Sequence, residues 1–456
     1  MNRKAVYIQS ALLLALVNIL LRGAGVSFNA YIARKIGAES MGLLSLTMSV
    51  YGFAVTLATS SVNLAAVRLT AERCAWIEGA DRGSYRKTIR GVLKSICGYS
   101  LLFGCGAALL LWIFAGGISR NLLGDSRTFS SLRVLALSLP PIALTSAMAG
   151  YFTGMRKIGK NALLAILEQG MKILVTATAL VLTSPTGSVE YMCLAVVGGS
   201  AVSEAWSLVT SMILYLTDSR MPKGTIPGSG KTTRETRFRD AAKIALPTAV
   251  GSYARQGLVT AEHLTIPWGM KQHGSDPESA MASYGVLQGM ALPVVLFPYA
   301  VIGSFTGVLI PEITAFHAKK EYRDLRRIIG RVLRYTFLFT GLCFIIFFCF
   351  ARQLGVGIYH NEESVKYIRI LAFLVPFMYV DTVTDAILKG MGEQVYCMKI
   401  NLVDAACSLV LVAVLTPVMG LYGYILSMFF CEIVNLGCSA WKLWDCVAKT
   451  KGKELR

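Results

Sequence analysis

Twelve long apolar runs dominate this chain and leave few folds open to it. Each run is at least about 18 to 20 residues long, enough for a helix to cross about 30 Å of hydrocarbon, and short polar segments separate the runs. The expected spans are residues 8–32, 44–67, 92–116, 132–154, 160–183, 189–216, 241–267, 284–310, 332–351, 367–388, 396–417 and 421–444. We therefore expect an all-α, polytopic integral membrane protein.

Composition and residue order exclude the other broad classes of protein. Hydrophobic residues make up 54% of the 456 residues and charged residues only 16%, and the mean hydropathy is +0.56. These values are too apolar for a soluble globular protein. A transmembrane β-barrel would show segments of about ten residues with alternating polarity, and the run from Phe337 to Phe350 does not alternate.

The net charge of +19 is distributed in a way that indicates membrane topology instead of nucleic-acid binding. If the N-terminus is inside, the inside loops and adjoining span ends hold 33 of the 45 Lys and Arg residues, and the outside segments hold 9. The positive-inside rule then predicts that both termini are cytoplasmic. The basic loops are expected to contact anionic lipid headgroups. The first apolar run is too long for a signal peptide and contains Arg22, so it is expected to stay uncleaved.

An internal repeat predicts two halves of six helices each. Residues 133–169 align without a gap with residues 369–405. Since each half begins inside, the two copies would be parallel repeats related by an axis along the membrane normal. The matched pairs are Arg133 with Arg369, Leu135 with Leu371, Ala136 with Ala372, Pro140 with Pro376, Gly154 with Gly390, Met155 with Met391 and Glu168 with Asp404.

The predicted division places a cytoplasmic linker between two lobes. The expected parts are an N-terminal lobe over 1–217, a linker over 218–240, a C-terminal lobe over 241–446 and a basic tail over 447–456. The linker contains Gly228-Ser229-Gly230-Lys231-Thr232-Thr233, but Thr225 stands where a phosphate-binding loop needs its first glycine. We therefore expect no bound nucleotide. The eleven cysteines form no C-x-x-C pair, so no metal and no organic cofactor is expected.

Three basic residues lie inside predicted spans and are candidates for substrate binding. Arg22 and Arg255 occupy equivalent spans of the two halves, and Lys172 lies in span 5. A charge at this depth is costly and should face protein or water, and a guanidinium group can bind phosphate oxygens in a bidentate manner. The structural alternative is that the arginines pair with Glu168 or Glu204. Lys172 lies four residues after Glu168, which equally allows an ion pair within the helix.

Acidic and amide residues in the last spans are candidates for ion coupling. Asn401 and Asp404 are three residues apart on span 11, and Glu432 and Asn435 have the same spacing on span 12. Each pair would share a helix face and offer oxygen ligands for Na⁺ or a site for H⁺. The alternative is that these polar pairs only join neighbouring helices. Asp381 and Asp385 are expected to line the inner mouth of span 10.

Short motifs along most of residues 20–440 resemble the stage V sporulation protein B-like family of polysaccharide biosynthesis flippases. This family belongs to the multidrug, oligosaccharidyl-lipid and polysaccharide exporter superfamily. The motifs appear in the family's order. They are Gly37-Ala38-Glu39, Met41-Gly42-Leu43, Ala58-Thr59-Ser60, Arg68-Leu69-Thr70-Ala71-Glu72, Leu135-Ala136-Leu137-Ser138-Leu139-Pro140, Gly150-Tyr151-Phe152-Thr153-Gly154, Glu168-Gln169, Gly289-Met290-Ala291-Leu292-Pro293, Leu309-Ile310-Pro311-Glu312-Ile313 and Leu388-Lys389-Gly390-Met391-Gly392-Glu393-Gln394.

The resemblance implies two six-helix lobes around a central cavity in a bacterial cytoplasmic membrane. It also implies movement of a polyprenyl-diphosphate-linked glycan, a precursor of peptidoglycan, spore cortex or another polysaccharide, by alternating access and without enzymatic chemistry. Arg22 and Arg34 resemble the first-helix arginines of lipid II flippases, which adds Arg34 to the substrate candidates. Phe28 and Asn29 stand where those flippases carry further charges. The expected partners are a lipid-linked oligosaccharide and membrane lipids, and the alternative function is a cation-coupled drug or metabolite exporter.

Overall fold

The computed structural model describes residues 3–76, 82–183, 188–217 and 238–454. Within these ranges the chain is helical apart from turns and short connections, and the described residues contain no β-strand. The predicted all-α class is therefore confirmed. Helices suit this chain because each satisfies its own backbone N–H and C=O groups where hydrocarbon offers them no partner. Most of the predicted linker lies outside the described residues, and the predicted tail is largely part of the last helix.

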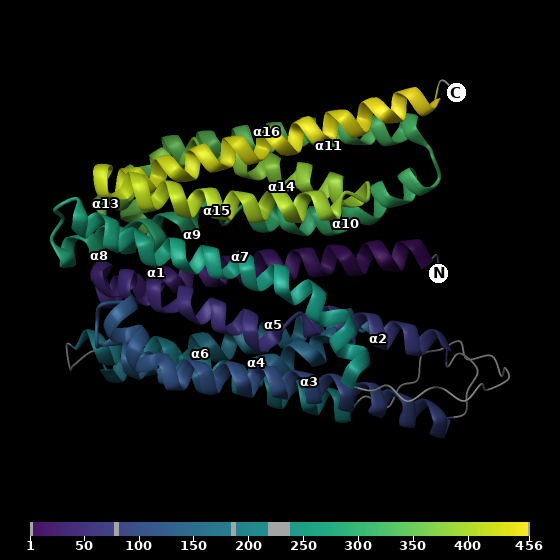
Figure 1. Ribbon diagram of the computed structural model, residues 1–456, viewed down its shortest axis with the longest axis horizontal. Helices are drawn as coiled ribbons and strands as arrows, with labels where there is room; N and C mark the ends of the chain where they lie inside the picture. Colours follow the sequence, from purple (N-terminus) through teal and green to yellow (C-terminus); the bar gives the residue numbers. More distant parts are fainter. Residues whose placement is uncertain (1–2, 77–81, 184–187, 218–237, 455–456) are drawn as a thin grey trace. The chain divides into compact units, whose positions relative to one another are not determined.

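Helices follow one another along the whole described chain (Figure 1). Two short segments, η1 and η3, are π-helical. The elements are α1 (Arg3–Thr59), α2 (Val62–Trp76), α3 (Arg82–Gly117), η1 (Ile118–Leu122), α4 (Thr128–Gly154), α5 (Ile158–Thr183), α6 (Val189–Leu216), α7 (Phe238–Gln272), α8 (Pro277–Gly285), η3 (Val286–Ala291), α9 (Leu292–Val295), α10 (Tyr299–Ala318), α11 (Tyr322–Cys349), α12 (Ala351–Tyr359), α13 (Glu362–Ala372), α14 (Val375–Gly390), α15 (Gln394–Met419) and α16 (Leu421–Glu454).

Nine helices in the described ranges are long and apolar enough to cross a membrane, and ten if a bent pair counts as one span. The first of these, over residues 16–73, comprises parts of α1 and α2 and overlaps two predicted spans, 8–32 and 44–67, because α1 continues through a break at Gly37. Gly37 has a φ of 80°, a conformation that glycine adopts without strain. The predicted span 241–267 corresponds to α7, which is more polar than the other spans and is not among these helices.

Prolines lie at the breaks within two predicted spans. The predicted span 284–310 is divided among α8, η3, α9 and α10, with Pro293 beginning the short α9 and Pro298 preceding α10. The predicted span 367–388 is the bent pair, in which α13 and α14 meet at 50° and Pro376 lies in the first turn of α14. The first N–H groups of a helix have no acceptor within the helix, so a proline, which has no N–H, is well tolerated there.

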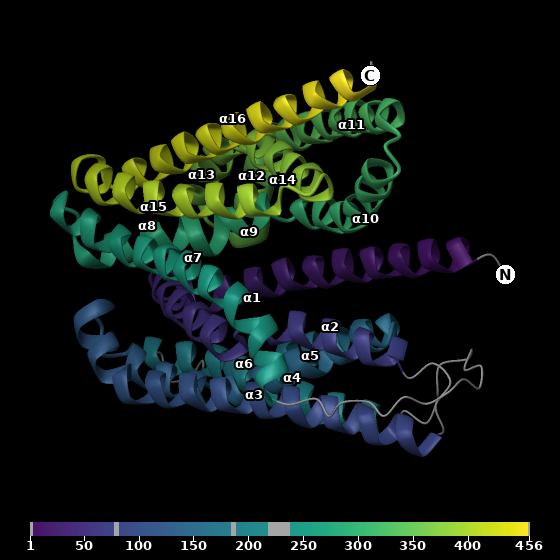
Figure 2. The same ribbon diagram turned by 45° about the vertical axis from the view of Figure 1, so that its right-hand side comes forward.

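The described chain forms two compact units. Unit 1 contains residues 1–46 and 261–456, and unit 2 contains residues 47–260. Figure 2 shows α15 and α16 running side by side within unit 1. The predicted lobes, 1–217 and 241–446, are defined by the internal sequence repeat, and their boundaries differ from those of the two compact units. The lobes therefore stay a prediction.

The two predicted repeat copies have matching helix ends. Helix α4 ends at Gly154 and α5 begins at Ile158, while α14 ends at Gly390 and α15 begins at Gln394. Both boundaries are therefore 236 residues apart, the offset of the sequence alignment.

The glycine that ends the first helix of each copy also packs closely on another helix of its own unit. A Cβ at Gly154 would lie 2.8 Å from Thr70 Cβ on α2, and a Cβ at Gly390 would lie 2.7 Å from Ile313 Cβ on α10. Side chains larger than hydrogen would separate these helices. The matched packing supports a common origin of the two segments.

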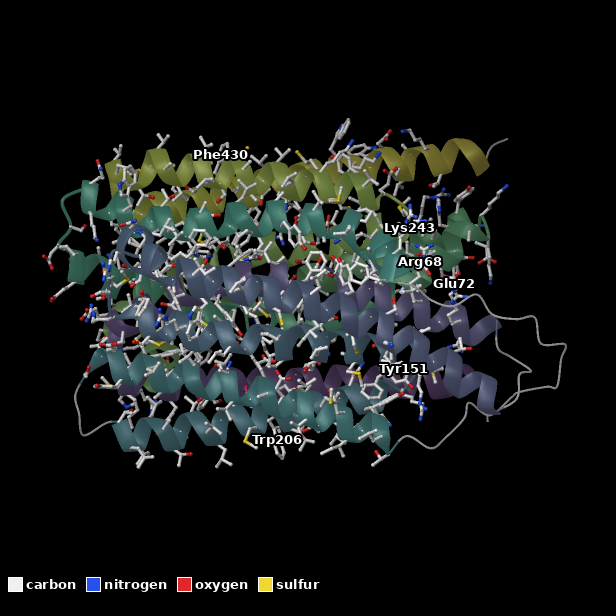
Figure 3. The ribbon with its side chains drawn as sticks, turned by 60° about the horizontal axis from the view of Figure 1, so that its bottom comes forward. Arg68, Glu72, Tyr151, Trp206, Lys243 and Phe430 are labelled. Atoms are coloured by element: carbon white, nitrogen blue, oxygen red, sulfur yellow. The ribbon has the colours of Figure 1, made fainter. Side chains whose placement is uncertain are left out.

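Large apolar side chains lie on the outside of both units. Figure 3 shows Trp206 of unit 2 and Phe430 of unit 1, and each points away from its own unit. Many other leucine, phenylalanine and tryptophan side chains are also exposed, including Leu338, which is 65% exposed. Such a surface fits acyl chains as its surroundings.

Candidate ion and substrate sites

A group of carboxylate and amide side chains lies within unit 1, on α7, α14, α15 and α16. Asp381 on α14, Glu262 on α7 and Asn435 on α16 are all buried. These residues interrupt apolar helices, and a buried polar group is costly unless it has a hydrogen-bond partner or a counter-charge. The contacts of this group therefore indicate what it can bind.

Asp381 and Asn435 form a buried pair that joins α14 to α16. The Asn435 side-chain amide donates to Asp381 Oδ2 at 3.0 Å. Among the described residues, Asp381 Oδ1 and Asn435 Oδ1 have no hydrogen-bond donor. Two buried oxygen acceptors on adjoining side chains suit a proton or a cation.

Asn401 contacts α14 as well as its own helix. Its amide donates to the Cys397 carbonyl at 2.8 Å and lies 3.4 Å from Asp385 Oδ2. Asp385 also accepts from Lys389 Nζ at 2.9 Å, one helical turn away. Asn401 therefore belongs to a second polar pair, with Asp385, and the predicted pairing of Asn401 with Asp404 stays a prediction.

Asp404 lies among the acidic side chains of the unit. It interacts electrostatically with Asp381, Glu262 and Glu432. Glu432 in turn interacts with Asp381. These electrostatic interactions connect the four acids into one group.

Glu262 is a member of this group that the sequence reasoning did not select. Its Oε1 accepts a hydrogen bond from Ser408 Oγ at 2.9 Å, which joins α7 to α15. The sequence does contain a signal that could have identified Glu262, because this residue is a carboxylate inside the predicted span 241–267. Asp381, which the sequence places at the inner mouth of span 10, is buried and pairs with Asn435.

The acidic group does not have the geometry of a closed metal site. In the described part of the chain, no three His, Cys, Asp or Glu side chains lie close enough together to hold a metal ion. The oxygens instead form separate pairs, Asp381 with Asn435 and Asp385 with Asn401.

A second polar group lies within unit 2. Ser207 on α6 donates to Glu168 Oε2 on α5 at 2.7 Å. Glu204 interacts electrostatically with Glu168 and Lys172. Among the described residues no ion pair joins Glu168 to Lys172, and Lys172 lies within electrostatic range of Glu204 on α6.

Arg22 and Arg255 lie in different units, and each is exposed on its own unit. Within the described residues of its unit, neither guanidinium group has an ion-pair partner. Arg22 is within electrostatic range of Tyr379 in unit 1. Because an arginine at this depth strongly disfavours lipid, an exposed position indicates access to water or to an anion.

Arg34 makes contacts that suit a structural role. Its Nε donates to the Ile358 carbonyl at 2.7 Å and its Nη2 to the Gly357 carbonyl at 2.8 Å, both in the last turn of α12. A cation stabilises the carbonyl groups at a helix C-terminus. Substrate binding by Arg34 stays a prediction, but two of its donors are already engaged.

Comparison with known proteins identifies the family. Residues 7–317 match the family described as polysaccharide biosynthesis protein, and residues 273–418 match the family described as MatE. The first match covers more than half of the chain and includes Arg22, Lys172 and Arg255.

Two curated relatives from Bacillus subtilis (strain 168) align along most of the chain. Stage V sporulation protein B is 25% identical over 435 residues, which are 93% of this chain and 81% of that protein. Lipid II flippase MurJ is 22% identical over 447 residues, which are 91% of this chain and 81% of that protein.

Solved structures of two kinds have the same fold. An inward-facing multidrug resistance MATE family transporter of the MOP superfamily has a TM-score of 0.71 at 14% identity, covering 96% of this chain and 99% of its own. The inward closed conformation of lipid II flippase MurJ has a TM-score of 0.69 at 13% identity, and the match covers 97% of this chain and 91% of the MurJ chain. The chain therefore belongs to the polysaccharide biosynthesis protein family, is a multi-pass membrane protein, and has the fold of these transporters and flippases.

Proposed function

We propose that this protein is a flippase that moves a polyprenyl-diphosphate-linked glycan from the cytoplasmic to the outer leaflet by alternating access. The observation that carries the proposal is the family match over residues 7–317. The relatives include a protein named as a lipid II flippase and another named for sporulation, so a wall or spore-cortex precursor is the favoured glycan. Both termini are proposed to be cytoplasmic.

In this proposal Arg22 and Arg255 each bind phosphate oxygens of the substrate during transport. Both are exposed guanidinium groups on helices of predicted spans, and neither has an ion-pair partner among the described residues of its own unit. Guanidinium groups stay charged when partly desolvated and match phosphate geometry with two parallel donors. Lys172 and Glu168 are proposed to contact the polar headgroup.

Coupling to Na⁺ or H⁺ is proposed for the acidic group of unit 1. Asp404, Glu432, Asn401 and Asn435 belong to it, together with Asp381 and Glu262. The polar side chains form separate pairs instead of one cluster of oxygens. Among the described residues, one oxygen of Asp381 and one of Asn435 have no donor. This arrangement favours H⁺ over Na⁺, because a proton can be held between two oxygens whereas Na⁺ needs several oxygen ligands. Binding there would alter the packing of α14 against α16 and so bias the transport cycle.

A drug or metabolite exporter is the second candidate, since MATE transporters are among the proteins with this fold. A binding experiment separates the two candidates. Purified full-length protein is titrated with undecaprenyl-diphosphate glycan, with undecaprenol and with a lipophilic cation, and thermal stabilisation is recorded. The flippase proposal expects stabilisation by the diphosphate lipid only. Stabilisation by the cation alone would favour the exporter.

A further inference from the structure

Helix α11 has a buried face and, opposite it, an exposed face along its whole length. One face is buried in unit 1 and comprises Leu325, Ile329, Val332, Thr336, Thr340, Cys343 and Phe347. The opposite face is exposed and begins with four arginines, Arg323, Arg327, Arg331 and Arg334. The spacings of four and three residues keep these arginines in one stripe of the helix surface.

The same exposed stripe turns apolar immediately after the last arginine. One turn beyond Arg334 lies Leu338, which is 65% exposed, and Leu342 and Ile345 follow, 56% and 54% exposed. Exposed aliphatic side chains in a membrane-spanning helix face acyl chains. The boundary between headgroups and hydrocarbon on this side of unit 1 therefore lies between Arg334 and Leu338.

Aromatic residues mark the same boundary. Tyr335 follows Arg334 and is 64% exposed. Helix α16 ends at the same end of unit 1 at which α11 begins (Figures 1 and 2). Trp441 and Trp444 on the second half of α16 are 69% and 78% exposed. Tyrosine and tryptophan concentrate at the level of the lipid headgroups, because their rings prefer hydrocarbon and their polar atoms prefer water.

Arg331 and Arg334 consequently lie at headgroup depth. They are about 4.5 Å apart along the helix axis, within a headgroup layer that is about 5 to 7 Å deep. Among the described residues, the acid nearest in the stripe is Asp324, which pairs with Arg327 at 3.1 Å. Arg331 and Arg334 have no acidic partner there, so no carboxylate neutralises these two exposed guanidinium groups.

We propose that Arg331 and Arg334 form a binding site for the phosphate of an anionic phospholipid in the leaflet at the N-terminal end of α11. The occupant is a lipid because the site continues into an acyl-facing surface. It is anionic because two adjacent guanidinium groups match phosphate oxygens in charge and geometry. Arg327 and Arg323 extend the stripe toward the headgroup's polar end. This site does not depend on the transported substrate.

The test is native mass spectrometry of the detergent-solubilised full chain titrated with phosphatidylglycerol, with phosphatidylcholine as the zwitterionic reference. Each arginine near a charged membrane surface contributes roughly a fivefold gain in affinity. We therefore expect R331Q+R334Q to weaken the tightest phosphatidylglycerol site about 25-fold and to leave phosphatidylcholine binding unchanged. R331K+R334K keeps the charge but loses the bidentate donors, so a smaller loss is expected.

A matched control removes two exposed charges beyond the other end of α11. Arg352 pairs with Glu362 at 3.5 Å, and Lys366 lies over the Tyr422 ring. R352Q+K366Q should bind phosphatidylglycerol as the parent does. Parental affinity in R331Q+R334Q, or an equal loss in the control variant, would overturn the proposal. The lysine variant guards against a folding defect, because it preserves the net charge and the exposed face.

Discussion

The side-chain amide of Asn435 donates to Asp381 Oδ2 at 3.0 Å, and this buried bond joins α16 to α14 at the centre of an acidic group. Within the described residues, the remaining oxygen of each side chain has no donor. Helix α14 also begins at the 50° bend after α13. A ligand that bridges these oxygens would therefore bind to a helix that begins at a bend.

Neutralising Asp381 should remove ion coupling without removing the side chain's volume. In Asp381→Asn, dependence of transport on an Na⁺ or H⁺ gradient should disappear, because the group loses the carboxylate that pairs with Asn435. Transport in vesicles under imposed gradients measures this effect. Asp324→Asn, an exposed acid outside the group, should behave like the parent. Retained gradient dependence in Asp381→Asn would make this carboxylate structural.

Asp404 provides an independent test of the same group. Asp404→Asn should also abolish gradient dependence, since Asp404 interacts with three other acids of unit 1. The variant should stay folded by size-exclusion chromatography. If Asp404→Asn keeps its gradient response while Asp381→Asn loses it, coupling resides in the Asp381–Asn435 pair alone.

The two exposed arginines should matter through phosphate binding. Arg22→Lys and Arg255→Lys keep the charge but lose the bidentate donors, so transport should fall in both and fall further in the alanine variants. Loss of one charge-assisted contact, about 1.5 to 3 kcal/mol, corresponds to a decrease of roughly 10- to 150-fold. Initial rates of lipid movement are the measurement. Parental rates in the double alanine variant would refute this role.

Arg34 should affect stability more than transport. Arg34→Gln removes the charged donors from the last turn of α12, with an expected cost of about 1 kcal/mol. Thermal unfolding should detect the change, while transport per folded molecule and apparent substrate affinity stay near parental values. A selective loss of substrate affinity would instead restore Arg34 to the substrate site.

The close packing at Gly390 predicts a stability difference between two similar substitutions. Gly390→Ala would force a methyl group toward Ile313 and should destabilise the protein by about 1 to 3 kcal/mol. Gly341→Ala has nothing within 4 Å of the new Cβ and should be neutral or slightly stabilising. Thermal unfolding of both variants in the same detergent compares them. Equal unfolding temperatures would contradict the packing argument.

Much of the fold could be predicted because lipid solvation leaves a strong signal in the sequence. The apolar runs predicted the helices, and the alignment of residues 133–169 with 369–405 predicted helix ends that match in the structure. The continuity of α1 through Gly37 could not be predicted, since a polar stretch between two apolar runs reads as a loop. The π-helical segment η3 also has no distinct sequence pattern.

The candidate sites could be predicted only in part, because residue spacing defines a helix face but not its partner. Asn401 and Asp404 share a face by spacing, yet Asn401 contacts Asp385 on α14. Likewise Arg34 is a substrate candidate through the family resemblance, but its side chain donates to carbonyl groups more than 300 residues away in the chain. Such contacts depend on helix packing across long sequence separations.

Movement of a labelled polyprenyl-diphosphate glycan across vesicles containing the purified full chain tests the central claim most directly. The label is placed on the glycan, and a membrane-impermeant reagent reports its arrival in the opposite leaflet. Our account predicts rapid exposure with the parental protein, and a much slower rate in vesicles with Arg22→Ala plus Arg255→Ala, which approaches that of protein-free vesicles. Exposure of the glycan at the protein-free rate with well-folded parental protein would contradict the account.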